Sequence, residues 1–268
     1  MSAALEYAGA LRGVVTRDLR IFVSYRARTF TQLAGLVLTM TIFYFVSQLV
    51  DVQQFRTSEE YFAFVVAGLL IMLILQSAAA APAALRQELV AGTFERSLVS
   101  PMGPLVGIVG LMLFPIAFAC LIACAGFLIA AAIFNLQVEW ATAPLAVPAA
   151  LLSAGAFAAI AVLVLAAVVM FKQSPGITWI VTLMALTGGV YFPVALLPGW
   201  ISWVSEVQPF TPAVDLLRQL LLGTTAGDPA MTALLKLAGF FVVLTPLSFL
   251  VLHAAIQSGR RRGTILEF

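Results

Sequence analysis

Charged and metal-binding side chains are scarce in this sequence. Charged residues make up 10% of the 268 residues, whereas a soluble domain carries about 25%. The two cysteines and the single histidine show no spacing typical of a zinc site. Cys120 and Cys124 share one face of a predicted helix, and we interpret them as small packing residues. The sequence therefore supports neither a soluble globular domain nor a metal-binding one.

Several chemical signatures are also missing. The chain has no Gly-x4-Gly-Lys-Ser/Thr loop, and neither of its lysines, Lys172 and Lys236, follows a glycine. It therefore cannot bind nucleotide through such a loop. The apolar runs hold no cluster of reactive side chains, which weighs against a membrane-embedded enzyme. They also lack the carboxylates and charged rings of an ion-coupled carrier or channel. We expect no catalytic residue, metal or cofactor in this chain.

Hydrophobic residues are abundant instead. They make up 62% of the chain, and the mean hydropathy is +1.08. In lipid every backbone polar group must be satisfied internally, which leaves helices or a closed barrel. The apolar runs are long and do not alternate as barrel strands do, so helices are favoured. Six transmembrane helices are predicted, at residues 30–50, 61–81, 105–134, 144–171, 177–197 and 232–257.

The distribution of basic residues predicts the orientation of these spans. With both termini in the cytoplasm, the inner segments hold eleven of the fourteen basic residues, as the positive-inside rule requires. Residues 4–28 precede the first span and place Arg12, Arg17 and Arg20 among apolar residues at near-helical spacing. We expect an amphipathic interfacial helix on the inner leaflet and its lipids. The alternative is a solvated basic arm.

Residues 82–104 form a charged island between the second and third spans. Arg86, Glu88, Glu95 and Arg96 lie in it, and prolines stand near both of its ends. A compact charged helix in a protein with little other cytoplasmic mass predicts a docking element. A solvated turn with self-paired charges remains the alternative.

Residues 198–229, before the last span, are mixed in character. Pro198, Pro209 and Pro212 break the segment. Its Glu206, Asp215 and Arg218 are costly in a spanning helix. Its leucines and tryptophans are too apolar for a free aqueous loop. We therefore predict a re-entrant helical hairpin that forms an external lid, with Asp215 and Arg218 paired three residues apart.

Two motifs resemble those of the type-2 ABC exporter permeases. The first is a glutamate followed by Gly-Thr-x-Glu, a leucine and a proline. Here these are Glu88, Gly92, Thr93, Glu95, Leu98 and Pro101, with Phe94 where leucine is common. The second motif ends the fifth span and continues beyond it. Its residues here are Gly188, Gly189, Phe192, Pro193, Leu197, Pro198, Trp200, Pro209, Thr211, Arg218 and Gly223.

The resemblance covers essentially the whole chain, 1–268, as one permease domain, and it implies a function. The chain would be the membrane subunit of an ATP-driven exporter for a hydrophobic or amphipathic substrate. The implied partners are two copies of a separate ATPase, which would bind ATP and Mg, and a second permease copy or close paralogue. The implied location is the plasma (inner) membrane of a prokaryote, and no nucleic acid is involved. The alternatives are a glycan exporter, whose Gly-x2-Trp pattern is missing at residues 32–38, and an ion-coupled carrier or channel.

The resemblance also assigns roles to particular residues. The implied ATPase-docking residues are Arg86, Glu88, Gly92, Thr93, Glu95 and Arg96. The implied residues of the external gate are Phe192, Pro193, Pro198, Trp200, Pro209, Thr211 and Arg218.

Overall fold

In the computed structural model of the chain, helices are the only regular elements of the described part, in which no strand occurs. This confirms the prediction of an all-α membrane protein. The described residues are 26–49, 55, 57–91, 103–171, 176–224 and 228–262. The helices are α2 (Arg26–Leu49), α3 (Ser58–Ala79), α4 (Ala81–Val90), α6 (Gly103–Phe134), α7 (Ala146–Phe171), α8 (Ile177–Thr187), α9 (Gly199–Glu206), α10 (Phe210–Leu222) and α11 (Ala230–Arg262).

Five helical stretches among the described residues are long and apolar enough to cross a membrane. They correspond to the first four and the last of the predicted spans. Their bounds are Thr29–Leu49, Ser58–Val90, Gly107–Phe134, Ala143–Phe171 and Ala230–Gly259. Hydropathy alone therefore located these five spans.

The fifth predicted span, 177–197, differs from the structure. Helix α8 ends at Thr187 after 11 residues, which is about 16 Å at 1.5 Å per residue and about half of the hydrocarbon core. Gly189 follows with a φ of +79°, and the Val190 N–H bonds to the Ala185 carbonyl at 3.4 Å. This is the Schellman arrangement that ends a helix at a left-handed glycine. The prediction of one continuous helix to residue 197 is therefore wrong.

The charged island also differs in part from the prediction. Helix α4 follows α3 directly, so the two form one apolar stretch of 33 residues. Pro82 lies in the first turn of α4, where its missing N–H costs no helical hydrogen bond. The first part of the island thus extends the second span. Residues 92–102, including the predicted docking residues Gly92, Thr93, Glu95 and Arg96, lie outside the described residues. The predicted interfacial segment 4–28 is described only from Arg26, inside α2.

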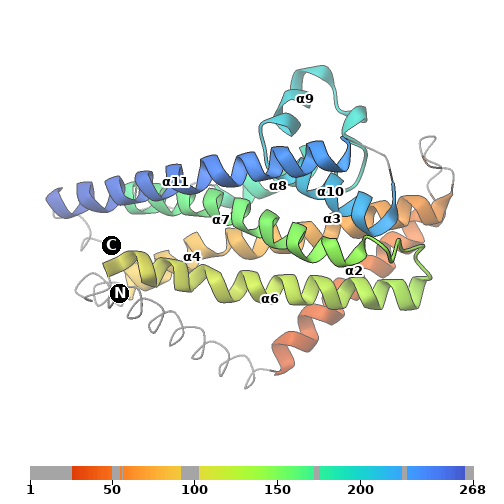
Figure 1. The fold of residues 1–268 in the computed structure, drawn as a ribbon. Coiled ribbons are helices and arrows are strands. Elements are labelled where there is room, and N and C mark those ends of the chain that lie inside the picture. Colours follow the sequence, from red (N-terminus) through yellow and green to blue (C-terminus); the bar gives the residue numbers. More distant parts are fainter. Residues whose placement is uncertain are drawn as a thin grey trace.

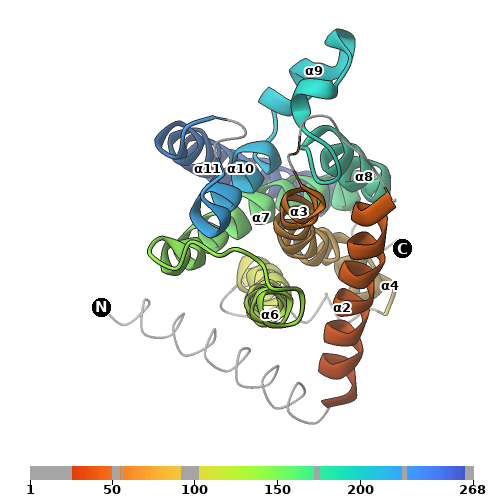
Figure 2. The same cartoon turned by 90° about the vertical axis from the view of Figure 1, so that its right-hand side faces the viewer.

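Helix α3 lies at the centre of the bundle. Figure 2 looks along the bundle axis and shows α3 surrounded by α2, α6, α7, α8 and α10, with α11 beyond α7. Few residues in the apolar windows of α2 and α11 are buried, whereas most of the α3 window is buried within the chain. Small residues permit neighbouring helices to pack closely. At Gly155 on α7, for example, an added Cβ would lie 2.5 Å from the Phe241 ring of α11, so α7 and α11 are in close contact there.

The two ends of the bundle carry different elements. Figure 1 shows α4 and the C-terminal end of α11 toward one end, and α9 and α10 toward the other. Arg261, in the last turn of α11, is exposed. We refer below to the α4 end and the hairpin end, the hairpin being residues 198–223.

Candidate functional site: the helical hairpin and its buried arginine

The hairpin consists of two short helices whose bounds follow from prolines and a glycine. Pro198 precedes α9, and Pro209 precedes α10. The residue before a proline is disfavoured in helical geometry, so α9 does not continue into α10. Gly223, with a φ of +63°, ends α10. The helices have 8 and 13 residues, about 12 and 20 Å, and neither is long enough to cross a bilayer.

The two hairpin helices differ sharply in burial. Helix α9 projects sideways from the bundle (Figures 1 and 2). Its Trp200 and Trp203 are 76% and 61% exposed. Helix α10 instead packs against α3, α7, α8 and α11, and most of its residues are buried. The part of the hairpin that contributes to the core of this chain is therefore α10.

Arg218 of α10 joins three elements of the bundle. Its side chain is almost fully buried, with 1% of the residue exposed. Nε and Nη2 donate to the Phe64 carbonyl of α3 at 3.1 and 3.0 Å. Nη2 also donates to the Gly189 carbonyl at 2.7 Å and, more weakly, to the Val190 carbonyl at 3.4 Å. We call this set of bonds the arginine clamp, because it ties α10 to α3 and to the chain just after α8.

The acceptors of the arginine clamp are available for a structural reason. A backbone carbonyl has two lone pairs, so the Phe64 oxygen can accept from Arg218 in addition to its helical bond. Gly189 and Val190 lie beyond the last turn of α8, where helical partners end. Without Arg218, the buried oxygens of Gly189 and Val190 would lose their side-chain donor, and a buried acceptor left without a partner costs about 1–3 kcal/mol.

The positive charge of Arg218 is also compensated. The Phe64 ring lies under the guanidinium, with Cζ 3.3 Å from the ring centroid, a favourable cation–π geometry. The Asp215 carboxylate is 3.9 Å from Nη1, which confirms the predicted pair as a loose contact. Burial raises the pKa of Asp215 to about 6, an effect that the Arg218 charge opposes. The guanidinium itself remains protonated in proteins.

Glycines allow the backbones to come close enough for the clamp. A Cβ at Gly68 on α3 would lie 2.9 Å from the Val190 oxygen and 3.2 Å from Nη2 of Arg218. At Gly188 it would lie 2.3 Å from the Phe210 ring. The distances of 2.9 Å and 2.3 Å are shorter than real Cβ contacts permit. The resemblance identified Gly188, but no signal in the sequence identified Gly68.

Gln208 provides a second polar link at the base of α10. This buried side chain donates from Nε2 to the hydroxyl of Thr187 at 3.1 Å and to that of Thr211 at 3.2 Å. It therefore connects the end of α8 to the start of α10. Sequence analysis missed Gln208; the available signal was a lone amide between the two apolar helices of the hairpin.

The predicted gate residues do not form one surface. Arg218 and Pro209 are buried, and Phe192, Pro193 and Thr211 are half-buried. Pro198 and Trp200 are exposed, on the outer side of the hairpin. Of the predicted docking residues, the structure describes two: Arg86 is exposed and Glu88 half-buried on α4.

Comparison with known proteins assigns the family. Among the curated proteins none matches this sequence. The family profile of the ABC-2 type transporters matches residues 11–222, well over half of the chain, and this range contains the α4 segment and the whole arginine clamp. Among the described residues, no group of three or more His, Cys, Asp or Glu could hold a metal ion. The chain therefore belongs to the family of ABC-2 type transporters and is a membrane subunit of an ABC transporter.

Proposed function

We propose that the chain is the membrane subunit of an exporter that moves a hydrophobic or amphipathic substrate outward, driven by a separate ATPase. The family match over residues 11–222 is the observation that carries this proposal. The five long spans are rich in apolar residues, which suits an apolar substrate better than an ion. Export and substrate class follow the resemblance of the two sequence motifs to exporter permeases.

We place the ATPase at the α4 end of the bundle. The stretch Ser58–Val90 has 33 residues and is about 50 Å long, about 20 Å more than the hydrocarbon core. Its α4 end therefore extends beyond the membrane core and presents the exposed Arg86. The basic end of α11 lies toward the same end (Figure 1), which supports a cytoplasmic location for it.

A second permease copy would complete the pathway. Helix α8 is too short to span the bilayer alone, and its Trp179, Leu183 and Leu186 are exposed. Helix α2 lies on the same side of the bundle (Figure 2), and few of its residues are buried. A closed two-fold dimer, the commonest symmetry of oligomers, would cover both helices.

The stretch from α3 to α4 gives this transporter a mechanical link between its two ends. A shift of α4 imposed by the ATPase would move α3, and the arginine clamp would carry α10 and the end of α8 with it. The hairpin would then act as an external gate that changes position with the nucleotide state. Such coupling requires the ATPase to bind the two states of the permease with different affinities.

The test is a charge reversal at the α4 end. The chain is purified with its ATPase from the native host, and E88R/E95R is compared with E59R. Glu59 is exposed in the first turn of α3, and its single reversal serves as a control for a surface charge reversal at the other end. We expect the double reversal to release the ATPase or to uncouple its activity from transport, and E59R to keep both. Retention of the ATPase and full transport in E88R/E95R would place the docking site elsewhere.

A further inference from the structure

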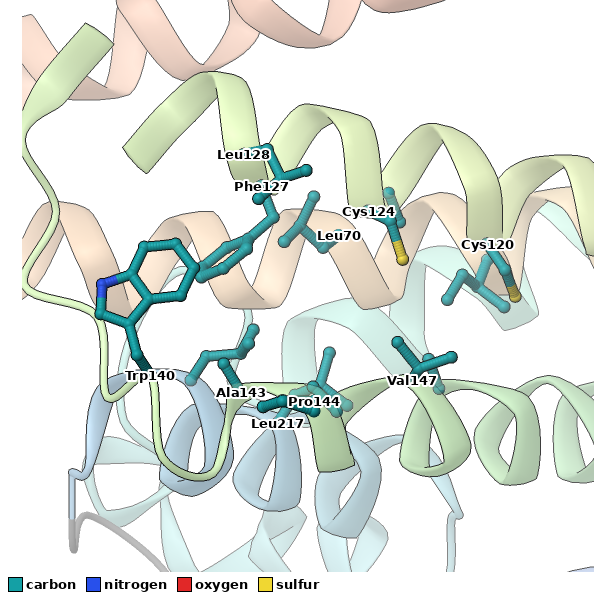
Figure 3. A pocket seen from close by; sticks show the side chains of 15 residues that line it. Leu70, Cys120, Cys124, Phe127, Leu128, Trp140, Ala143, Pro144, Val147 and Leu217 are labelled. Atoms are coloured by element: carbon teal, nitrogen blue, oxygen red, sulfur yellow. The ribbon is translucent and has the colours of Figure 1, made fainter. Parts of the chain in front are cut away.

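An apolar pocket lies between α6 and α7, and none of the residues of the arginine clamp lines it. Its volume is about 280 Å³, close to the lower end of about 300–1,000 Å³ for ligand sites. Figure 3 shows the Cys120 and Cys124 side chains extending from α6 toward α7, where Val147 faces them. Leu70 of α3 and Leu217 of α10 also line the pocket, and Trp140 stands at one end.

The walls of the pocket select for a hydrocarbon. The lining side chains are aliphatic or aromatic, apart from the two thiols and the indole nitrogen of Trp140. A bound water needs two to four polar partners, and a polar solute buried here would leave its groups without hydrogen bonds. Apolar cavities of this kind bind apolar ligands.

The shape and opening of the pocket agree with an extended chain. On α6 the lining runs from Cys120 to Leu128, about 12 Å along the helix axis, and this axis follows the membrane normal in a spanning helix. Cys120 is buried whereas Cys124 is exposed, and Leu128 and Val147 are exposed as well. The pocket therefore opens sideways, on the flank of α6 and α7, which are both long and apolar enough to span a membrane.

The end at Trp140 matches the level of the lipid headgroups. Trp140 is exposed beyond the end of α6, and tryptophans with one apolar and one wet side favour the membrane interface. Its loop is fixed to α10, because the Glu139 N–H bonds to the Leu221 carbonyl at 2.9 Å and the Thr142 hydroxyl to the Leu220 carbonyl at 2.7 Å. A headgroup can remain at this end while its chain enters between the helices.

We propose that this pocket binds one acyl chain of a phospholipid from the surrounding leaflet. The bound acyl chain would contact Leu217 and Leu221 of α10, which lie on either side of the clamp residue Arg218 in the sequence. The bound lipid thereby fills the space between α6, α7 and α10 and supports the packing of α10. The lipid is a resident component and not the cargo, so this proposal does not depend on the direction or substrate of transport.

The test uses the full chain with its ATPase in nanodiscs that contain a phospholipid with a diazirine in the middle of one acyl chain. After irradiation, adducts are mapped by mass spectrometry of peptides. We expect adducts on the pocket residues Cys120, Ala123 and Phe127, in addition to those on outward residues such as Leu121. Adducts confined to outward residues would overturn the proposal, because such labelling reports only lipids around the protein.

Two substitutions on α6 provide a matched comparison. A123F places a ring in the pocket, whereas A132F places it on an exposed position of the same helix. We expect loss of the pocket adducts in A123F and their retention in A132F, with labelling of Leu121 unchanged in both. If A123F does not fold, A150F fills the same pocket from α7. If A123F or A150F folds and still gives the pocket adducts, the proposal is contradicted.

A second experiment distinguishes a resident lipid from transported cargo. The labelling is repeated while the ATPase hydrolyses ATP, with a vanadate-inhibited sample as the control. A resident acyl chain gives equal pocket labelling in both samples. Pocket labelling that falls during turnover would assign the pocket to cargo and overturn its assignment to a structural lipid.

Discussion

Helices α9 and α10 are neighbours in one hairpin, yet they are stabilised in different ways. Helix α10 is buried among four helices and is held by Arg218 and Gln208. Helix α9 lies at the side of the bundle with Trp200 and Trp203 exposed. The contacts that fix α10 come from within the chain, whereas the apolar face of α9 is available to the membrane interface or to another subunit. Substitutions in α10 should therefore destabilise the isolated chain, and substitutions in α9 should act only in the assembled, membrane-embedded protein.

Among the variants that test this comparison, R218M is expected to lower the stability of the chain most. The substitution removes the donor for the carbonyls of Phe64, Gly189 and Val190 and leaves the buried Asp215 carboxylate without its partner. Breaking a buried charged pair in this way costs about 3–5 kcal/mol. We expect a large fall in the apparent melting temperature of the chain purified in detergent, measured by the loss of its monodisperse chromatographic peak.

Two further variants at this site sharpen the interpretation. R218K keeps the charge but loses the planar fork that reaches three carbonyls, so its melting temperature should lie between those of R218M and the original protein. D215N should cost less than R218M, because the carboxylate is 3.9 Å from the guanidinium and the carbonyl bonds are shorter. A melting temperature for R218M equal to that of the original protein would refute the clamp.

The next largest effect is expected from G68A. Its new methyl would meet the Val190 oxygen at 2.9 Å, and overpacking of this kind costs about 1–3 kcal/mol. G239A is the control, since nothing lies within 4 Å of its Cβ on α11 and alanine favours a helix by about 0.5–1 kcal/mol. The two alanines should thus shift the melting temperature in opposite directions. Equal shifts would mean that α3 and Val190 do not pack as closely as the structure shows.

The sequence predicted most of the architecture because lipid imposes simple requirements. Five of the six predicted spans agree with helices of the structure. The error at residues 188–197 arose because hydropathy counts apolar residues and does not register that Gly188 and Gly189 end a helix. The hairpin could be predicted from its prolines and charges, since these oppose a spanning helix by local rules.

The arginine clamp could be predicted only in part. The pairing of Asp215 with Arg218 is local, three residues apart, and was expected. The main acceptor is a backbone carbonyl 154 positions away in sequence, and carbonyls are present at every residue, so no pattern marks Phe64. The sequence does not indicate the role of Gly68 either, because a glycine within an apolar helix can have many roles. Such contacts are fixed by the packing of α3 against α10 and become visible only in three dimensions.

A smaller effect is expected from Q208L at the base of α10. The substitution removes two hydrogen bonds, to Thr187 and Thr211, and each is worth about 1 kcal/mol in net stability. The leucine keeps an apolar contact, so the loss should be well below that of R218M. T182V, which removes a hydroxyl bonded only within α8, provides the control. A melting temperature for Q208L no lower than that for T182V would show that Gln208 does not connect the two helices.

The smallest effect on the isolated chain is expected from W200A/W203A on α9. Both rings are exposed, and the indole Nε1 of Trp203 bonds only to the Trp200 carbonyl of the same helix at 3.0 Å. Surface substitutions of this kind change stability by no more than about 0.5 kcal/mol, so the melting temperature in detergent should hardly move. In a bilayer the same rings would lose a favourable interfacial position. Transport by the reconstituted complex should therefore fall although the chain remains folded. A strong loss of stability in detergent would mean that α9 packs against the bundle as α10 does, and the contrast between the two helices would no longer stand.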